Sequence, residues 1–322
     1  MRLAWLHAQL TTSNRPLIVG PFRSEVGFEC LYWVPWLAQL RHQWKLPRER
    51  VIALSRGGAG IWYDAAQAVD LYNYVPADRL RKAQLVDSAS QRSIKQWAVT
   101  PWERALLPVI AQDLGLRRYH WLHPSLMYRT LAPWWDGQQG LSWISQRLRF
   151  APLPVPHPPL ELPLPSRYVA VRFYARYTWP MRDELKVWVA NLVDQIASHI
   201  PVVVLRSPFH VDDHQDFPVA GPNILDLAPY VTVQTSLAVQ SAVLAKADAF
   251  VGTYGGTLQL AVRLGRPAIG FYEKFQGTAP AHKTLTEAIA MQQDTPLAIL
   301  TPKGASFIGQ IMGAAEPTAL PR

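Results

Sequence analysis

The sequence AFVGTYGGTLQLAVRLGRPAIGFYE, residues 249–273, decides the fold class that we expect. Its pattern predicts a strand, a turn with two glycines, a short helix and a second strand, with Tyr254 exposed beside the turn. Because glycine has no Cβ, an anion can come close to the backbone of Gly255 and Gly256. A helix that starts near Thr257 would add N–H groups and the positive end of its dipole. We therefore predict a phosphate site at this turn; a tight turn that needs a positive φ is the alternative.

The same alternation runs through the rest of the second half of the chain. A helix is predicted to begin at Thr235 or Ser236, whose hydroxyl would accept a hydrogen bond from a first-turn amide. Strands that alternate with helices predict parallel sheets with right-handed crossovers. The other expected elements here are strands at 168–174, 201–207 and 223–228 and a helix at 183–199.

The first half of the chain has a similar but less regular pattern. A helix is predicted where Leu31, Val34, Leu37 and Leu40 recur at helical spacing. The remaining expected elements are strands at 15–20 and 50–55, a glycine loop at 56–60, a helix from Ile61 to Leu71, and a mostly helical region at 85–150.

A proline-rich segment, PLPVPHPPLELPLP at 152–165, separates these two parts. Seven of its fourteen residues are proline, which fixes φ and removes a backbone donor, so a helix or a central strand is not expected. We predict a semi-rigid linker, with a ligand for a proline-binding domain as the alternative. The expected architecture is α/β, with two Rossmann-like domains, at 1–151 and 166–322, that face a cleft.

Charge is distributed unequally between the two halves. The net charge is +9; residues 1–150 contain 19 Lys and Arg against 10 Asp and Glu, whereas residues 151–322 contain 13 of each. A basic half can attract nucleic acid, an anionic membrane surface or an acidic substrate, and ordinary solvated surface is the alternative. The single cysteine, Cys30, allows no internal disulfide and favours a reducing compartment. Because the sequence has neither a signal-like N-terminus nor an apolar run of about 18 residues, we expect a cytoplasmic protein.

The second half contains an ordered series of short motifs. They are Asp226-Leu227, Thr235-Ser236-Leu237, Ala247-Asp248, Val251-Gly252, Gly255-Gly256 and Leu264-Gly265-x-Pro267. A Trp179-Pro180 pair also follows a basic residue after the predicted strand at 168–174. This series resembles the donor-binding region of GT-B glycosyltransferases, most closely the bacterial lipopolysaccharide heptosyltransferases. The resemblance covers roughly residues 165–275 and implies a GT-B fold whose second domain binds a nucleotide-sugar.

The resemblance also implies which residues contact the donor. Gly255, Gly256 and Thr257 would hold its diphosphate, with Tyr254 and Gln259 beside the donor. The heptosyltransferases have an acidic residue where this chain has Tyr254 and a histidine where it has Gln259. Since that acidic residue contacts the donor sugar in the family, we do not expect the sugar here to be a heptose.

Three further side chains of the second half are candidates for donor binding. Arg172 and Arg176 end the first strand of this domain, and a guanidinium can bind a diphosphate at two points. The alternative for Arg176 is an exposed surface residue with no role in donor binding. Asp226 follows another predicted strand and would accept a hydrogen bond from a ribose or base, or act as a turn residue.

The first half offers a candidate general base. The segment GPFRSEVGFECLYW at 20–33 is similar to polysaccharide-cluster glycosyltransferases in its Gly-Pro-x-x-x-Glu-x-Gly-x-Glu run. Glu25 precedes the predicted helix, and from there a carboxylate could take the proton of an acceptor hydroxyl. For Glu29 we expect only a favourable interaction with the helix N-terminus, which is also the alternative for Glu25.

These features together predict a glycosyltransferase of polysaccharide biosynthesis that moves a sugar from a nucleotide-sugar donor to a glycan or lipid-linked acceptor. We expect no cofactor other than this substrate, no nucleic-acid partner and no metal, because no acidic pair with metal spacing follows a strand. The segment HVDDHQD at 210–216 has no compact metal-ligand spacing and is expected to be a solvated loop. Peripheral association with the inner face of the membrane is compatible with this hypothesis. The alternatives are another GT-B enzyme, such as a sugar-nucleotide epimerase or a pyruvyl transferase, or a non-catalytic nucleic-acid-binding protein.

Overall fold

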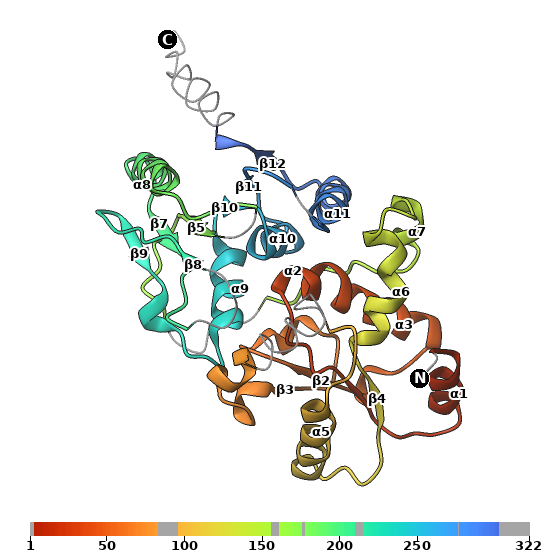
Figure 1. The fold of residues 1–322 in the computed structure, drawn as a ribbon. Helices are drawn as coiled ribbons and strands as arrows, with labels where there is room; N and C mark the ends of the chain where they lie inside the picture. The colour runs from red at the N-terminus through yellow and green to blue at the C-terminus, as the bar shows by residue number, and fades with distance from the viewer. Residues whose placement is uncertain are drawn as a thin grey trace, which may run out of the picture.

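The computed structural model describes residues 3–82, 96–155, 161–175, 178–209, 215–275 and 277–302 of the 322-residue chain. It contains two parallel sheets with helices packed around them, one formed by each half of the chain (Figure 1). The predicted α/β class with two parallel sheets is therefore confirmed. The domain boundaries around 152–165 stay a prediction.

The first sheet has four strands in the order β3-β2-β1-β4, all parallel to their neighbours. Its strands are β1 (Leu17–Val19), β2 (Val51–Ser55), β3 (Gln67–Asp70) and β4 (His120–Leu122). The helices of this half are α1 (Leu3–Thr11), α2 (Val26–Phe28), α3 (Val34–Trp44), α5 (Pro101–Asp113), α6 (Ser125–Trp135) and α7 (Leu141–Ser145). A π-helical turn, Glu29–Trp33, joins α2 to α3.

One expectation for this half was wrong. The segment Ile61–Leu71 is not a helix: a 3-10 turn at Ala59–Trp62 is followed by β3, which pairs along β2. The region 85–150 was expected to be mostly helical, and its described part from residue 96 is so, although the unpredicted strand β4 lies inside it and pairs with β1. Both strands depend on pairing with residues distant in the chain, which local periodicity does not reveal.

The second sheet has six parallel strands in the order β12-β11-β10-β5-β7-β9. They are β5 (Val169–Arg172), β7 (Val202–Val204), β9 (Ile224–Asp226), β10 (Ala249–Thr253), β11 (Ala268–Phe271) and β12 (Leu297–Leu300). A short antiparallel pair joins β6 (Tyr174–Ala175) and β8 (Gln215–Asp216). The helices are α8 (Asp183–Ala197), α9 (Ser236–Lys246), α10 (Gly256–Arg263) and α11 (Ala279–Gln292). The strands and helices predicted for this half are present in the predicted order, whereas β6, β8, α11 and β12 were not predicted.

The two halves are packed tightly against each other, with α2 facing α10 (Figure 1). The Gly57 carbonyl accepts hydrogen bonds from the amides of Leu237 and Ala238 at 2.8 and 3.0 Å. The Gly57 carbonyl is therefore the acceptor for these first-turn amides of α9. We expected the hydroxyl of Thr235 or Ser236 to accept such a bond, and that expectation was wrong. Gly57 has a φ of 61°, and a Cβ on it would lie 2.8 Å from the Ser236 hydroxyl oxygen. One hydrophobic core spans both halves at this contact.

Within the described part of the chain, no helix combines the length and the apolar character needed to cross a membrane.

Candidate functional site

Three arginines from the carboxyl ends of three strands meet at one cavity between the halves. Arg56 follows β2, Arg172 is the last residue of β5, and Arg206 lies two residues after β7. All three line a cavity of about 260 Å³, together with Tyr72 of the first half and Gln240 of α9. In open α/β sheets, ligands bind at the carboxyl ends of the strands, and this cavity lies at that edge of both sheets.

Each of these arginines is oriented by a carboxylate. Arg56 Nη1 lies 3.0 Å from Glu29 Oε2, and Arg172 Nε lies 3.1 Å from Asp216 Oδ1. Arg206 forms an ion pair with Asp226. A guanidinium has five N–H donors in a fixed plane, so it can contact several acceptors at once. Arg56 also donates to the Ser24 carbonyl. The cavity is thus lined by cationic groups whose positions are fixed.

Glu29 is the most deeply buried of these carboxylates. Its side chain has no solvent exposure and accepts hydrogen bonds from the Ser55 hydroxyl, the Tyr63 hydroxyl and Arg56. Burial raises the pKa of the Glu29 carboxyl, although Arg56 and the two hydroxyls favour its charged form. The expectation that Glu29 only interacts with a helix N-terminus was therefore wrong, because it holds Arg56 at the cavity.

The Gly255–Gly256 turn lies beside this cavity at the start of α10. Arg172 Nη1 donates to the Thr257 hydroxyl at 3.4 Å, which connects the arginine cavity to the first turn of the helix. A Cβ on Gly255 would overlap the Tyr174 hydroxyl, and one on Gly256 would lie 2.8 Å from the Gly27 amide nitrogen. Gly255 has an extended φ of 169°, so the alternative that this turn needs a positive φ was wrong. Close backbone approach explains these glycines.

A second, much smaller cavity brings together most of the other predicted site residues. Glu25, Tyr254, Gly255, Gly256 and Gln259 all line a space of about 30 Å³. That volume holds about one water molecule, so a diphosphate does not fit in this space in the arrangement observed. The structure thus places the predicted base next to the glycine turn, which the sequence had left in separate halves.

Tyr254 differs from the expectation that it is exposed. Its side chain is buried, and its hydroxyl donates to the Ala279 carbonyl at 3.4 Å. Burial raises the pKa of this phenol far above its usual value. It therefore packs beneath the turn and stacks edge-on against Phe275, because the start of α11 covers it.

The remaining predicted residues have different outcomes. Asp226 pairs with Arg206 and accepts a hydrogen bond from the Ala228 amide at 3.0 Å, as a turn residue does. Arg176 and residues 210–214 lie outside the described part of the chain, so the hypotheses about them stay predictions. The expected loop at 210–216 was wrong for its last two residues, because Gln215 and Asp216 form β8 and Asp216 pairs with Arg172. Sequence reasoning missed Arg56 and Arg206, although each directly follows an apolar strand pattern.

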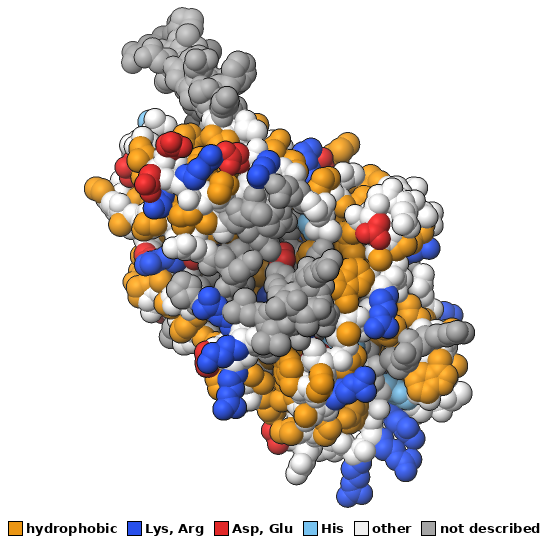
Figure 2. Space-filling view, in the orientation of Figure 1, with side chains coloured by type: hydrophobic (Ala, Val, Ile, Leu, Met, Phe, Trp, Pro, Cys, Tyr) orange, Lys and Arg blue, Asp and Glu red, His pale blue; other side chains and the backbone are white. Residues whose placement is uncertain are grey.

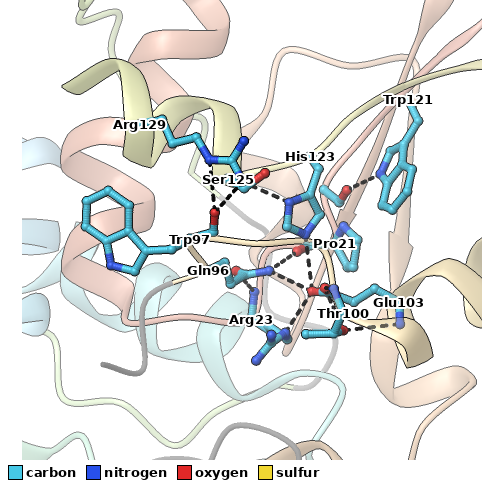
Figure 3. Close-up of polar contacts among 11 residues, drawn as sticks. Pro21, Arg23, Gln96, Trp97, Thr100, Glu103, Trp121, His123, Ser125 and Arg129 are labelled. Atoms are coloured by element: carbon cyan, nitrogen blue, oxygen red, sulfur yellow. Dashed lines mark hydrogen bonds and ion pairs between the residues drawn. The ribbon is translucent and has the colours of Figure 1, made fainter. Parts of the chain in front are cut away.

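A buried polar network holds the loop that leads to Glu25 (Figure 3). Arg23 Nε lies 2.9 Å from Glu103 Oε1, and His123 Nε2 lies 3.3 Å from the same oxygen. Gln96 accepts from the Arg23 amide and donates to Glu103. Burial would raise the pKa of Glu103, but His123 and Arg23 outweigh it and lower this pKa to about 2. The loop after β1 is therefore fixed by a carboxylate that stays ionised.

The surface charge follows the division into halves. On the face shown in Figure 2, Lys and Arg side chains dominate over the first half, whereas acidic and basic side chains are mixed over the second. This agrees with the unequal charge of the two halves in the sequence.

Comparison with known proteins gives structural neighbours only. No family model and no curated protein sequence matches the chain. Among solved structures, E. coli heptosyltransferase WaaC with ADP matches at 15% identity, with 93% of this chain and 99% of that chain covered and a TM-score of 0.42. The E. coli ADP-heptose lps heptosyltransferase II matches at 12% identity, with 87% and 99% covered and a TM-score of 0.41. A glycosyl transferase family 9 protein from Veillonella parvula matches at 13% identity, with 95% and 93% covered and a TM-score of 0.41.

Proposed function

We propose that this chain is a glycosyltransferase that moves a sugar from a nucleoside diphosphate sugar to a glycan or lipid-linked acceptor in polysaccharide biosynthesis. The observation that supports this most is the convergence of Arg56, Arg172 and Arg206 on one cavity between the halves. A diphosphate is the part of such a donor that needs several fixed cations, and guanidinium groups bind its oxygens at two points each.

In this proposal the arginines act on the leaving group. As the bond between the anomeric carbon and the diphosphate breaks, negative charge builds on the diphosphate oxygens. Arg172, held by Asp216 and bonded to Thr257, would stabilise that charge from the second half. Arg56 would do so from the first half, so the site is complete only when the halves are together. Since these guanidinium groups supply the positive charge, the proposed transfer is metal-independent and needs no cofactor.

Glu25 is the proposed base. It is the N-cap residue of α2, is partly exposed, and lines the small cavity with Gly255 and Gly256. The acceptor oxygen would form the new bond to the anomeric carbon while its proton passes to the Glu25 carboxylate. The acceptor needs more space than about 30 Å³, so α2 and α10 would separate to admit it and close again to exclude water.

Calorimetry with ADP, UDP, GDP and CDP tests the donor half of this proposal. We expect at least one of them to bind, and Arg172→Met to lower its affinity about tenfold or more, because a charged hydrogen-bond donor to the phosphate is lost. The matched control is Arg167→Met, since Arg167 pairs with Asp248 on the exposed surface, away from the cavity. No binding of any nucleoside diphosphate, or equal affinity in both variants, would contradict the proposal.

Product analysis then separates transfer from the other GT-B activities. With a sugar nucleotide labelled in the sugar, transfer moves the label to an acceptor, whereas epimerisation leaves it on the nucleotide. Pyruvyl transfer would move no labelled sugar. A cytoplasmic location, with peripheral attachment to the inner face of the membrane for lipid-linked acceptors, is part of the same proposal.

A further inference from the structure

A larger cavity lies apart from the predicted donor residues. Its volume is about 790 Å³, and it is bounded by α3, the Ala59–Trp62 turn, β3 and residues 149–154. This volume is within the range of about 300–1,000 Å³ that is typical of small-molecule sites. Gly57 and Leu237 line the arginine cavity, whereas Gly58 and Gln234 line the larger one. The contact of the Gly57–Gly58 turn with the start of α9 therefore separates the two cavities.

The wall of the larger cavity is mostly apolar. The apolar side chains include Val34, Leu37, Ile61, Trp62, Pro152 and Leu153. The exposed residues Ala66 and Ala68 also belong to the wall, which shows that it reaches the surface. An apolar molecule that enters here would leave water for a hydrocarbon-like surface, which is favourable in proportion to the area buried.

Cations outnumber carboxylates in the lining of this cavity, which contains Arg41, Arg48, Arg149 and Arg263 against Asp64 and Asp70. Arg41 and Arg48 both lie within ion-pair distance of Asp64. Arg263 lines the same cavity, yet in the described part of the chain no carboxylate lies within ion-pair distance of it. Arg263 is only 2% exposed. A cation buried to this degree without a counterion is costly, and an anion beside it would offset that cost.

Arg263 is fixed in place by the first half. Its Nε donates to the Cys30 carbonyl at 3.2 Å, its Nη2 donates to the Ala151 carbonyl at 3.0 Å, and its guanidinium lies 4.9 Å from the centre of the Phe150 ring. Its Nη1 has no hydrogen-bond partner among the described residues. Burial lowers the pKa of Arg263 to about 10, so it remains a cation at neutral pH.

We propose that this cavity binds an amphipathic anion, with an alkyl or prenyl chain against Val34, Leu37 and Ile61 and a carboxylate or phosphate on Arg263. The cavity combines the two features that such a ligand needs, namely an extended apolar wall and a fixed cation with no acidic partner. The proposal does not depend on the proposed glycosyl transfer, because no predicted donor residue lines this cavity.

Binding of three twelve-carbon amphiphiles, kept below their micelle concentrations, tests the proposal. We expect dodecanoate or dodecyl phosphate to bind at least about tenfold more tightly than dodecanol, since only the anions can pair with Arg263. Tighter binding of the phosphate identifies a lipid phosphate as the natural class, and tighter binding of the carboxylate identifies a fatty acid. No binding of either anion, or equal binding of dodecanol, would overturn the proposal.

Two variants locate the site. Arg263→Met should lower anion affinity about tenfold while leaving dodecanol unchanged, because it removes the charge and keeps an apolar side chain of similar length. Since Arg263 also joins α10 to the first half, a second variant is needed that does not touch this contact. Ala66→Trp places a ring in the cavity from its exposed wall and should weaken all three amphiphiles, whereas Ala105→Trp on the exposed side of α5 should weaken none. Unchanged binding in Ala66→Trp would overturn the assignment.

Discussion

Replacing Glu103 with glutamine would remove the charge of a buried carboxylate while keeping its shape. Glu103 completes a capping box at the start of α5, in which Thr100 and Glu103 exchange hydrogen bonds, and glutamine can replace glutamate in that motif. The variant therefore keeps the cap of α5 and loses the attraction of the carboxylate for Arg23 and His123 (Figure 3). Arg23, which is only 1% exposed, would lose its ion pair with Glu103 while staying buried.

Two independent arguments give the size of this effect. The pKa of Glu103 falls from 4.5 to about 2 on folding, and at 1.36 kcal/mol for a tenfold change this corresponds to about 3 kcal/mol of stability. Breaking a buried ion pair by removing one partner costs roughly 3–5 kcal/mol in other proteins. Because the folded-state pKa is depressed, this contribution is complete above the unfolded-state pKa near 4.5 and is lost as the pH falls towards about 2.

Urea unfolding, followed by tryptophan fluorescence from pH 7 down to roughly pH 3, measures this contribution. We expect Glu103→Gln to lower the free energy of unfolding by about 3 kcal/mol at pH 7 and by roughly half as much near pH 3. Glu184→Gln, which changes an exposed glutamate in the first turn of α8, is the control and should change little at either pH. A difference that is absent at pH 7, or that is the same at every pH, would refute the reasoning.

Three further predictions follow from the site. Glu25→Gln should lower turnover about 10²–10⁴-fold while nucleoside diphosphate affinity in calorimetry stays the same, because it removes the proposed base and leaves the arginines unchanged. Gly256→Ala should lower the free energy of unfolding by about 1–3 kcal/mol, measured as a lower midpoint of urea unfolding. The added Cβ would lie 2.8 Å from the Gly27 amide nitrogen, so backbone of the other half would have to move. Gly265→Ala is the control, because a Cβ at Gly265 meets nothing within 4 Å although φ is 69°. It should lower the free energy of unfolding only by the backbone strain of about 1 kcal/mol. An equal loss of stability in both variants would contradict the packing argument for Gly256.

The pattern of the sequence was sufficient for elements whose stability is mostly local. The strand 249–253, the helix at 183 and the strand 268–271 combine apolar periodicity with clear turn residues, and the structure contains all three. It was insufficient for Gln67–Asp70 and His120–Leu122, because these short segments are strands only through their neighbours in the sheet. Periodicity records which faces are apolar, and it contains no information about which distant strand lies alongside.

The ion pairs of the candidate site could not be predicted from local sequence patterns either. Arg56 and Glu29 are 27 positions apart, and Arg206 and Asp226 are 20 positions apart, so no local motif marks either pair. Tyr254 follows a strand and precedes a glycine turn, which is typical of an exposed position, but α11 folds over it from a later part of the chain. The glycines at 255 and 256 were singled out from the sequence as an anion site, and that role stays a prediction. Their physical reason, contact with Tyr174 and Gly27, requires the packing of the two halves.

That packing constrains any mechanism for this chain. The halves share a hydrophobic core, the Gly57 carbonyl satisfies the first amides of α9, and Gly27 lies directly against Gly256. Of the two cavities that the predicted donor and base residues line, the arginine cavity has a volume of about 260 Å³, whereas the space beside Glu25 holds about one water molecule. In the proposed mechanism, a donor diphosphate would therefore enter before an acceptor could reach Glu25. Because Arg56 and Arg172 come from different halves, an anion between them would also favour closure, and this would couple donor binding to the exclusion of water in the proposed transfer.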